Sequence, residues 1–488
     1  MSDTSLRNKT IKGVGWSAAD VFLPQGMTFF VGLILARLLT PEEYGLIGIC
    51  MIFNTVLNGI VDSGFSSAII RKKDVTNVDY NTMFITNMVI SIVLYLILFI
   101  STPWISKFFA REELSILIRV MGCVIIINAL SITQITNLTK KIDFKTKTKA
   151  SLISAFISGF IGIAMAYSGF GVWALVAQIV SKQILMTICL WIFNRWWPDF
   201  SFSCESFQYM WGFGSKLMIS GLLDNVWKQL YQVVVGKFYS PATLGQYTRS
   251  NEYANIFSAN ITSIVQRVSY PALAEIQDDT SRMVAAYRKV IKVTMFVTSV
   301  CMISIGAVAE PLIYCLIGPQ WHEAATFLPL ICISMSLYPL HAINLNMLQI
   351  QGRSDIFLYL DIIKKIIALP VLAIGIFMNI YWMLIGSIVI GIISFFLNTY
   401  YTGKKLGYTS WMQLKDVSAS YGVAFLIAIS VYFLKYLPLS YWVILPIQII
   451  VGITVCLIVC EKVQLMEYVE IKNIVLSAIH KYGRKHEQ

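Results

Sequence analysis

Long apolar runs alternate with short polar connections along almost the whole chain. Residues 82–100 and 421–434 are two such runs, and the polar stretches between runs stay under twenty residues. A helix needs about 20 mostly apolar residues to cross a hydrocarbon core about 30 Å thick. The pattern therefore predicts an all-α polytopic membrane protein with about 14 transmembrane helices. It leaves no stretch long enough for a soluble domain.

Composition supports this interpretation. Of the 488 residues, 57% are apolar and 13% are charged, whereas soluble proteins average about 25% charged residues. This excludes a soluble enzyme, a nucleic-acid-binding protein and a disordered scaffold. The first twelve residues are polar and the first apolar run is long, so no cleavable signal peptide is expected. The nine cysteines show no metal-ligand spacing, so we expect small packing residues and no metal site.

Lys and Arg are concentrated in every second connection. The densest cluster lies at residues 140–149, while the intervening connections hold few basic residues. The positive-inside rule places the basic connections, and both termini, in the cytoplasm. The net charge of +12 is therefore interpreted mainly as a topology signal. A lipid-headgroup role for the 140–149 cluster is the lesser alternative.

A sequence repeat divides the chain. Residues 36–45 read ARLLTPEEYG, and residues 236–245 read GKFYSPATLG, which matches by residue type. Each copy is typical of a helix end, a hydroxyl N-cap and a Pro in the next first turn. Because the shift crosses six spans, we expect parallel repeats about an axis along the membrane normal. The predicted organisation is a six-helix lobe at 1–200, a second at 201–403, and two further helices with a cytoplasmic tail at 404–488.

Polar stripes run along four of the predicted spans, near 14–38, 44–66, 211–236 and 243–269. A charge at the bilayer centre costs about 2.5–3.5 kcal/mol, so it normally faces a cavity or a partner. At 100° per residue, the polar groups of 211–236 cover about one third of that helix surface. Two lobes that each turned such a pair inward would enclose one hydrated cavity. The alternative is that these groups pair and pack between helices.

The stripes supply the candidate site residues. A cavity rich in Lys and Arg suits an anionic substrate, because phosphates accept charge-assisted hydrogen bonds from these side chains. Carboxylates could gate the cavity or couple to H⁺ or Na⁺. The expected substrate-binding cations are Lys216, Lys228, Arg249 and Arg267; the expected gating or ion-coupling carboxylates are Asp20, Asp62, Asp224 and Glu252; the expected polar cavity groups are Asn54, Asn58, Asn251 and Asn255.

Charged residues within two further parts of the predicted spans could pair with each other, and the sequence also limits the possible energy source. Asp224 and Lys228 are spaced i,i+4 and could neutralise each other. Asp361, Lys364 and Lys365 could serve a transport groove or form an ion pair at a helix end. No P-loop pattern or metal constellation occurs in the sequence. We therefore expect no cofactor apart from a coupling ion, and no enzyme activity.

Several segments carry a family resemblance. The chain resembles Wzx-type flippases, most closely the WzxC-like group, of the multidrug/oligosaccharidyl-lipid/polysaccharide exporter superfamily. The resemblance implies a MATE/MOP-like fold and a multi-pass protein of the bacterial inner membrane. The segments that carry it are ARLLTPEEYGL at 36–46, DSGFSSAIIR at 62–71, GKFYSP at 236–241 with LGQY at 244–247, YPAL at 270–273, and QGR at 351–353.

The resemblance also implies a function. Undecaprenyl-diphosphate-linked oligosaccharide repeat units would cross the membrane by alternating access, for assembly of O-antigen, capsule or exopolysaccharide. The implied partners are the polyprenyl-diphosphate-linked oligosaccharide, membrane lipid, and polysaccharide polymerase with chain-length machinery. No nucleic acid partner is expected.

Three alternatives remain open at this point. A peptidoglycan lipid-precursor flippase would also use a cationic cavity. A cation-coupled multidrug exporter of the same superfamily would favour acidic and aromatic residues, which the basic spans argue against. A membrane polysaccharide polymerase or ligase would need a long external loop, which the pattern does not offer.

Overall fold

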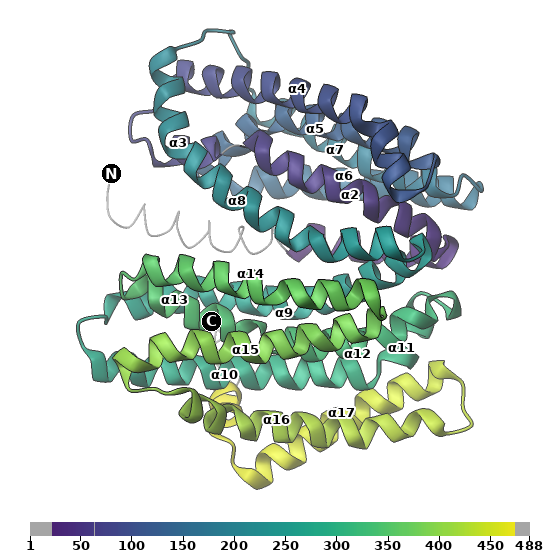
Figure 1. The fold of residues 1–488 in the computed structure, drawn as a ribbon, viewed down its shortest axis with the longest axis vertical. Helices are drawn as coiled ribbons and strands as arrows, with labels where there is room; N and C mark the ends of the chain where they lie inside the picture. Colours follow the sequence, from purple (N-terminus) through teal and green to yellow (C-terminus); the bar gives the residue numbers. More distant parts are fainter. Residues whose placement is uncertain (1–21, 63, 474–488) are drawn as a thin grey trace, which may run out of the picture. The chain divides into compact units, whose positions relative to one another are not determined.

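The computed structural model describes residues 22–62 and 64–473. Every regular element within these ranges is helical, which confirms the predicted all-α class. The chain divides into two compact units, Met1–Gly245 and Gln246–Gln488. The predicted division at 1–200, 201–403 and 404–488 stays a prediction. Figure 1 shows the ribbon.

Within the described residues, the first helix of the first unit is Phe22–Leu38. Its helices α4 and α5 pack together, as do α6 and α7, and α8 lies on α2, α3 and α4. The further elements are α2 (Pro41–Asp62), α3 (Phe65–Arg71), α4 (Asn77–Phe109), α5 (Glu113–Lys140), α6 (Phe144–Tyr167), α7 (Val172–Asn194), α8 (Cys204–Phe238) and the first turn of α9 (Pro241–Glu275).

The second unit contains the rest of α9 and the helices that follow. In it α10 packs on α12 and α16, α14 packs on α15, and α16 packs on α17. Its elements are α10 (Thr280–Ala307), α11 (Ala309–Leu316), η1 (Pro319–Trp321), α12 (His322–Ser336), α13 (Tyr338–Ile350), α14 (Ser354–Phe377), α15 (Ile380–Leu406), α16 (Ser410–Tyr432), η2 (Phe433–Tyr436), α17 (Tyr441–Val463) and a helix at 466–473.

Ten helical segments of the described chain are long and apolar enough to cross a membrane. The two 35-residue helices α8 and α9 are not among them, because their polar stripes lower the mean hydropathy. Together with Phe22–Leu38 and α14, they make the described helices compatible with the predicted number of spans. The chain is a multi-pass membrane protein.

Local sequence explains where several helices begin. Thr76 caps α4, because its side chain accepts from the Asp79 N–H while the Asp79 carboxylate accepts from the Thr76 N–H. Ser203 caps α8, because its hydroxyl oxygen accepts a hydrogen bond from the Ser206 N–H. The Asp79 carboxylate also accepts from Lys72 Nζ at 2.7 Å and from Ser206 Oγ at 2.7 Å. One buried carboxylate thus ties the starts of α4 and α8 together.

Hydrogen bonds to Asp199 stabilise the connection between α7 and α8. Its carboxylate accepts hydrogen bonds from the N–H and the hydroxyl of Ser201, at 2.9 and 2.6 Å, and from the Asn81 amide of α4. The Ser201 hydroxyl and N–H lower the pKa of Asp199 below its ordinary value, because they stabilise the charged carboxylate. The connection before α8 is therefore an ordered part of the first unit.

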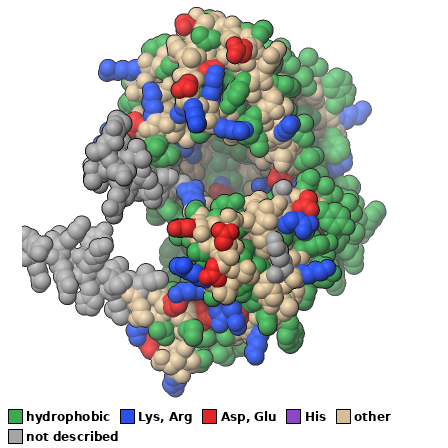
Figure 2. All heavy atoms as spheres, turned by 90° about the vertical axis from the view of Figure 1, so that its left-hand side faces the viewer, with side chains coloured by type: hydrophobic (Ala, Val, Ile, Leu, Met, Phe, Trp, Pro, Cys, Tyr) green, Lys and Arg blue, Asp and Glu red, His purple; other side chains and the backbone are tan. Residues whose placement is uncertain are grey.

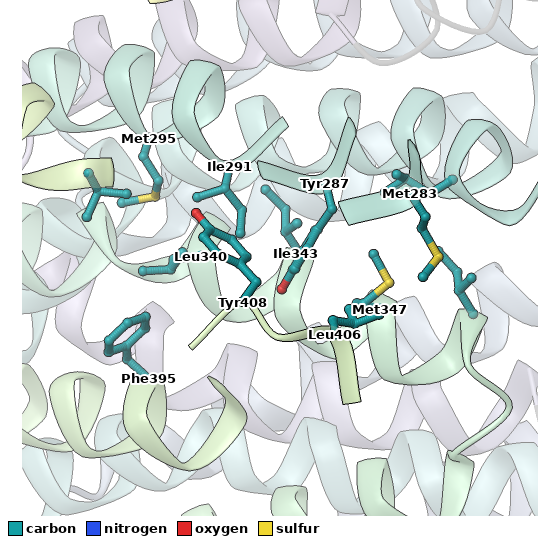
Figure 3. Packing of buried hydrophobic residues seen from close by; sticks show 13 residues of the cluster. Met283, Tyr287, Ile291, Met295, Leu340, Ile343, Met347, Phe395, Leu406 and Tyr408 are labelled. Carbon is teal, nitrogen blue, oxygen red and sulfur yellow. The ribbon is translucent and has the colours of Figure 1, made fainter. Parts of the chain in front are cut away.

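The apolar core of the second unit surrounds the buried polar side chain of Asn344. Side chains from α10, α13 and α15 interdigitate with Tyr408, as Figure 3 shows. Within this core the Tyr287 hydroxyl donates to Asn344 Oδ1 at 2.6 Å, and Gln413 Nε2 donates to the same oxygen at 3.1 Å. These bonds satisfy the buried side-chain oxygen of Asn344 and link α10, α13 and α16.

The outer surface suits a bilayer. Many large apolar side chains of the long helices are exposed, which matches surface that contacts lipid. Figure 2 shows Lys and Arg side chains gathered on one face, with apolar side chains covering the flank. Examples that are more than half exposed are Ile97, Ile100, Phe160, Ile429 and Ile450.

Candidate substrate-binding faces

Helix α8 carries the first predicted face. Lys216 and Lys228 are exposed along it, and Asp224 is half-buried between them. At 100° per residue the three positions fall within one third of the helix surface. The structure therefore places these predicted residues on one continuous polar strip of the first unit.

Glycines bring α8 close to α2. A Cβ on Gly59 would lie 2.6 Å from Asn225 Nδ2, and one on Gly64 would lie 2.8 Å from the Gly214 carbonyl oxygen. At Gly59 the Asn225 side chain could move aside, whereas at Gly64 a larger residue would meet the backbone of α8 and push it away. Gly64 also has a φ of 67°, which favours glycine. The polar strip of α8 is thus held beside the α2 helix.

The polar residues of α2 bond within the first unit. Asn128 Nδ2 of α5 donates to Asn58 Oδ1 at 2.8 Å, and Asn58 Nδ2 donates to the Asn54 carbonyl at 2.8 Å. Ser66 Oγ of α3 donates to Asp62 Oδ1 at 2.5 Å. Asn54 is only 4% exposed. These contacts serve packing between helices, and a cavity role for Asn54, Asn58 and Asp62 stays a prediction.

The sequence-based reasoning missed Lys182 on α7. Its Nζ donates to Thr28 Oγ1 of the first helix at 3.1 Å. The next residue, Gln183, donates to Asn128 Oδ1 at 3.2 Å and so joins the cluster around Asn58. A single Lys inside an apolar run was the signal that could have found this site. Asp20, the acid predicted on the same first helix, lies outside the described residues.

Helix α9 carries the second predicted face. Arg249 pairs with Glu252 at 2.6 Å, and the Arg249 side chain is 11% exposed while Glu252 is 47% exposed. Arg267 is exposed further along the helix. Asn255 Nδ2 donates to the Asn251 carbonyl at 2.9 Å, a bond within the helix. The two arginines are eighteen positions apart, so they fall on the same side of α9.

Helix α9 docks on η1 and α12. Gln246 Nε2 donates to the Gln320 carbonyl at 2.8 Å, while Gln246 Oε1 accepts from the Ala324 N–H at 2.9 Å. Ser258 Oγ donates to the Met335 carbonyl at 2.6 Å. Neutral hydrogen bonds thus hold α9 against η1 and α12 within the second unit.

Helix α14 contains an ion pair that was one of two alternatives for its charged residues, and a role in a transport groove stays a prediction. Lys365 Nζ lies 2.6 Å from Asp361 Oδ2, an i,i+4 ion pair. Lys364 is half-buried beside it. The expected ion pair is therefore present on a helix that belongs to the second unit.

Comparison with known proteins identifies the family and relatives that the chain resembles. The model of a family described as polysaccharide biosynthesis protein matches residues 34–326. The succinoglycan biosynthesis transport protein ExoT of Rhizobium meliloti (strain 1021) is 26% identical over 337 residues, covering 69% of this chain and 68% of that protein. The lipopolysaccharide biosynthesis protein WzxC of Escherichia coli (strain K12) is 22% identical over 377 residues, with 76% of each chain covered.

Solved structures share the fold. The lipid II flippase MurJ in an inward closed conformation aligns with a TM-score of 0.72 and 15% identity, covering 91% of this chain and 97% of that one. An inward-facing multidrug resistance MATE family transporter of the MOP superfamily aligns with a TM-score of 0.60 and 16% identity, covering 80% and 99%. The predicted MATE/MOP-like fold is thereby confirmed. Since the family model covers more than half of its length, the chain belongs to the polysaccharide biosynthesis protein family.

Proposed function

We propose that the chain is a flippase that moves undecaprenyl-diphosphate-linked oligosaccharide repeat units across the bacterial inner membrane. Family membership and relatives named for succinoglycan and lipopolysaccharide biosynthesis support a polysaccharide cargo. The observation that carries the proposal is the set of cations on α8 and α9. Lys and Arg side chains on otherwise membrane-length helices match a diphosphate, which accepts several charge-assisted hydrogen bonds at once.

The proposed mechanism makes and breaks no covalent bond. Lys216, Lys228, Arg249 and Arg267 hold the diphosphate and so offset the cost of removing it from water. Asp224 and Glu252 neutralise these cations when cargo is absent, and an H⁺ or Na⁺ is the proposed coupling ion. The glycan crosses along the polar faces while the lipid tail stays in the bilayer. Both termini lie in the cytoplasm in this proposal, because the basic connections follow the positive-inside rule.

Neutralising one cation on each face tests the proposal. We expect Lys228→Gln and Arg249→Gln each to reduce surface polysaccharide at least about tenfold, since each removes a charge-assisted bond of about 1.5–3 kcal/mol. Lys228→Arg should retain export because it keeps the charge. Surface polysaccharide, membrane levels of the protein, and lipid-linked repeat units in the cytoplasmic leaflet are measured together.

Lys73→Gln provides the matched control. Lys73 is an exposed lysine in the connection between α3 and α4, so its neutralisation should leave export unchanged. Full export in both Lys228→Gln and Arg249→Gln would contradict the proposed role of these faces. Resistance to cationic drugs conferred by the unaltered chain, with no effect on polysaccharide, would contradict the proposed cargo.

A further inference from the structure

A cavity with a few polar side chains lies within the second unit, and no residue of α8 or α9 lines it. It encloses about 360 Å³ where the end of α10 meets α11, α12 and η2. Its floor is built from small residues, Gly306, Ala307, Ala309 and Ala325, and its polar lining includes Glu310, His322, Tyr432 and Lys435. Pockets of this size accept a small organic group through a few convergent polar side chains.

One carboxylate and one ammonium group face each other in this cavity. Glu310 Oε1 accepts from the Tyr441 hydroxyl at 2.9 Å, and Glu310 Oε2 accepts from Lys435 Nζ at 3.3 Å. The lysine contact is longer than the 2.7–2.9 Å typical of charge-assisted bonds. A lysine carries three N–H donors and a carboxylate accepts about four bonds. The pair can therefore bind further charged groups without separating.

Aromatic rings form the remaining wall. Tyr314 stacks on Tyr441 with centroids 5.1 Å apart and the rings nearly parallel. Lys435 Nζ lies 4.2 Å from the centre of the Tyr432 ring. These rings fix Glu310 and Lys435 between rigid side chains, so the two charges are held in place before any ligand arrives.

The cavity lies at the level expected for lipid headgroups. Directly beside it, η2 and the start of α17 expose Phe433, Tyr436 and Trp442, which are 64%, 68% and 63% exposed. Exposed aromatic residues at the end of membrane-spanning helices mark the membrane–water interface. Phospholipid headgroups are the most concentrated polar molecules at that depth.

We propose that this cavity binds the headgroup of a phospholipid that carries both a phosphate and a primary ammonium group, as phosphatidylethanolamine does. Lys435 donates to the phosphate, His322 adds a ring N–H, and Glu310 accepts from the ammonium. A choline headgroup has no N–H to donate to Glu310, and a glycerol headgroup has no cation to place there. The lining shares no residue with the cargo faces, and this proposal does not depend on the proposed transport.

Competition between lipids tests the site on the unaltered protein. The purified chain is placed in nanodiscs of equal phosphatidylethanolamine and phosphatidylcholine, and the lipids that stay bound are counted by native mass spectrometry. We expect phosphatidylethanolamine to exceed phosphatidylcholine about tenfold, the equivalent of one bond to a charged group. Free inorganic phosphate, added as a competitor, should not displace it, whereas displacement by phosphate would assign the site to a simple anion and overturn the proposal.

Two variants locate the binding. Glu310→Gln should remove the preference for phosphatidylethanolamine while retaining some phospholipid, and Lys435→Gln should reduce retention of both lipids. Glu461→Gln is the matched control, because it disrupts an exposed ion pair between Glu461 near the end of α17 and Lys472 of the following helix, and neither residue lines the cavity. Equal retention of the two lipids by the unaltered chain would overturn the proposal. So would a preference that survives both Glu310→Gln and Lys435→Gln.

Discussion

At the scale of single residues, Lys182 stands out because it brings an ammonium group into the first unit. Its hydrogen bond goes to the Thr28 hydroxyl, a neutral partner that offsets only part of the cost of embedding a charge. A lysine in such a place is expensive for folding, and we expect transport to use its charge. Its neighbour Gln183 connects it to the amide cluster around Asn128 and Asn58.

Replacement of Lys182 by Met separates folding from transport. We expect Lys182→Met to keep or raise the thermal stability of the purified protein. Methionine is similar to lysine in length but carries no charge, so the substitution removes an embedded charge without leaving a large cavity. We expect the same variant to lower polysaccharide export about tenfold. Lys182→Arg, which retains the charge, should preserve part of the export. Normal export by Lys182→Met, at an unchanged protein level, would show that the charge has no role in transport.

At the scale of elements, the two copies of the repeat touch each other. A Cβ on Gly45 would lie 1.7 Å from the Pro241 carbonyl oxygen, and one on Gly245 would lie 1.9 Å from the Pro41 carbonyl oxygen. The first turn of α2 and the first turn of α9 therefore meet backbone to backbone in the first unit. The sequence showed the two segments to be related, but their reciprocal contact follows only from the structure. It explains why each copy ends in glycine.

Alanine at either glycine should be costly. We expect Gly45→Ala and Gly245→Ala each to destabilise the protein by about 1–3 kcal/mol, because the added methyl group forces two backbones apart. Gly422→Ala in α16 is the control, since nothing lies within 4 Å of a Cβ there, and alanine favours a helix interior by about 1 kcal/mol. Thermal unfolding in detergent measures all three. Unchanged unfolding temperatures for both Gly45→Ala and Gly245→Ala would refute the contact.

At the scale of the whole molecule, the sequence predicted the class and the helices better than the site. The apolar runs are long and strongly patterned, so most of the helices could be located from hydropathy, while the polar α8 and α9 also required the spacing of their polar stripes. Side-chain partners could not be located in that way. Asn58 and Asn128 are seventy positions apart yet bond at 2.8 Å, and periodicity carries no information about which helices are neighbours. The same gap in information hid the partners of Lys182 and Glu310 and the contact between the glycines.

The central claim is that this chain moves a lipid-linked oligosaccharide, held by cations on α8 and α9, without altering a covalent bond. The most direct measurement reconstitutes the purified protein in liposomes with a fluorescent polyprenyl-diphosphate-linked oligosaccharide. A membrane-impermeant quencher then reports transfer between leaflets, and the lipid is recovered for mass analysis. We predict transfer that depends on the protein, is lost in Lys228→Gln and Arg249→Gln, and returns the lipid intact. Transfer no faster than in protein-free liposomes, or recovery of a cleaved or extended glycan, would contradict the account.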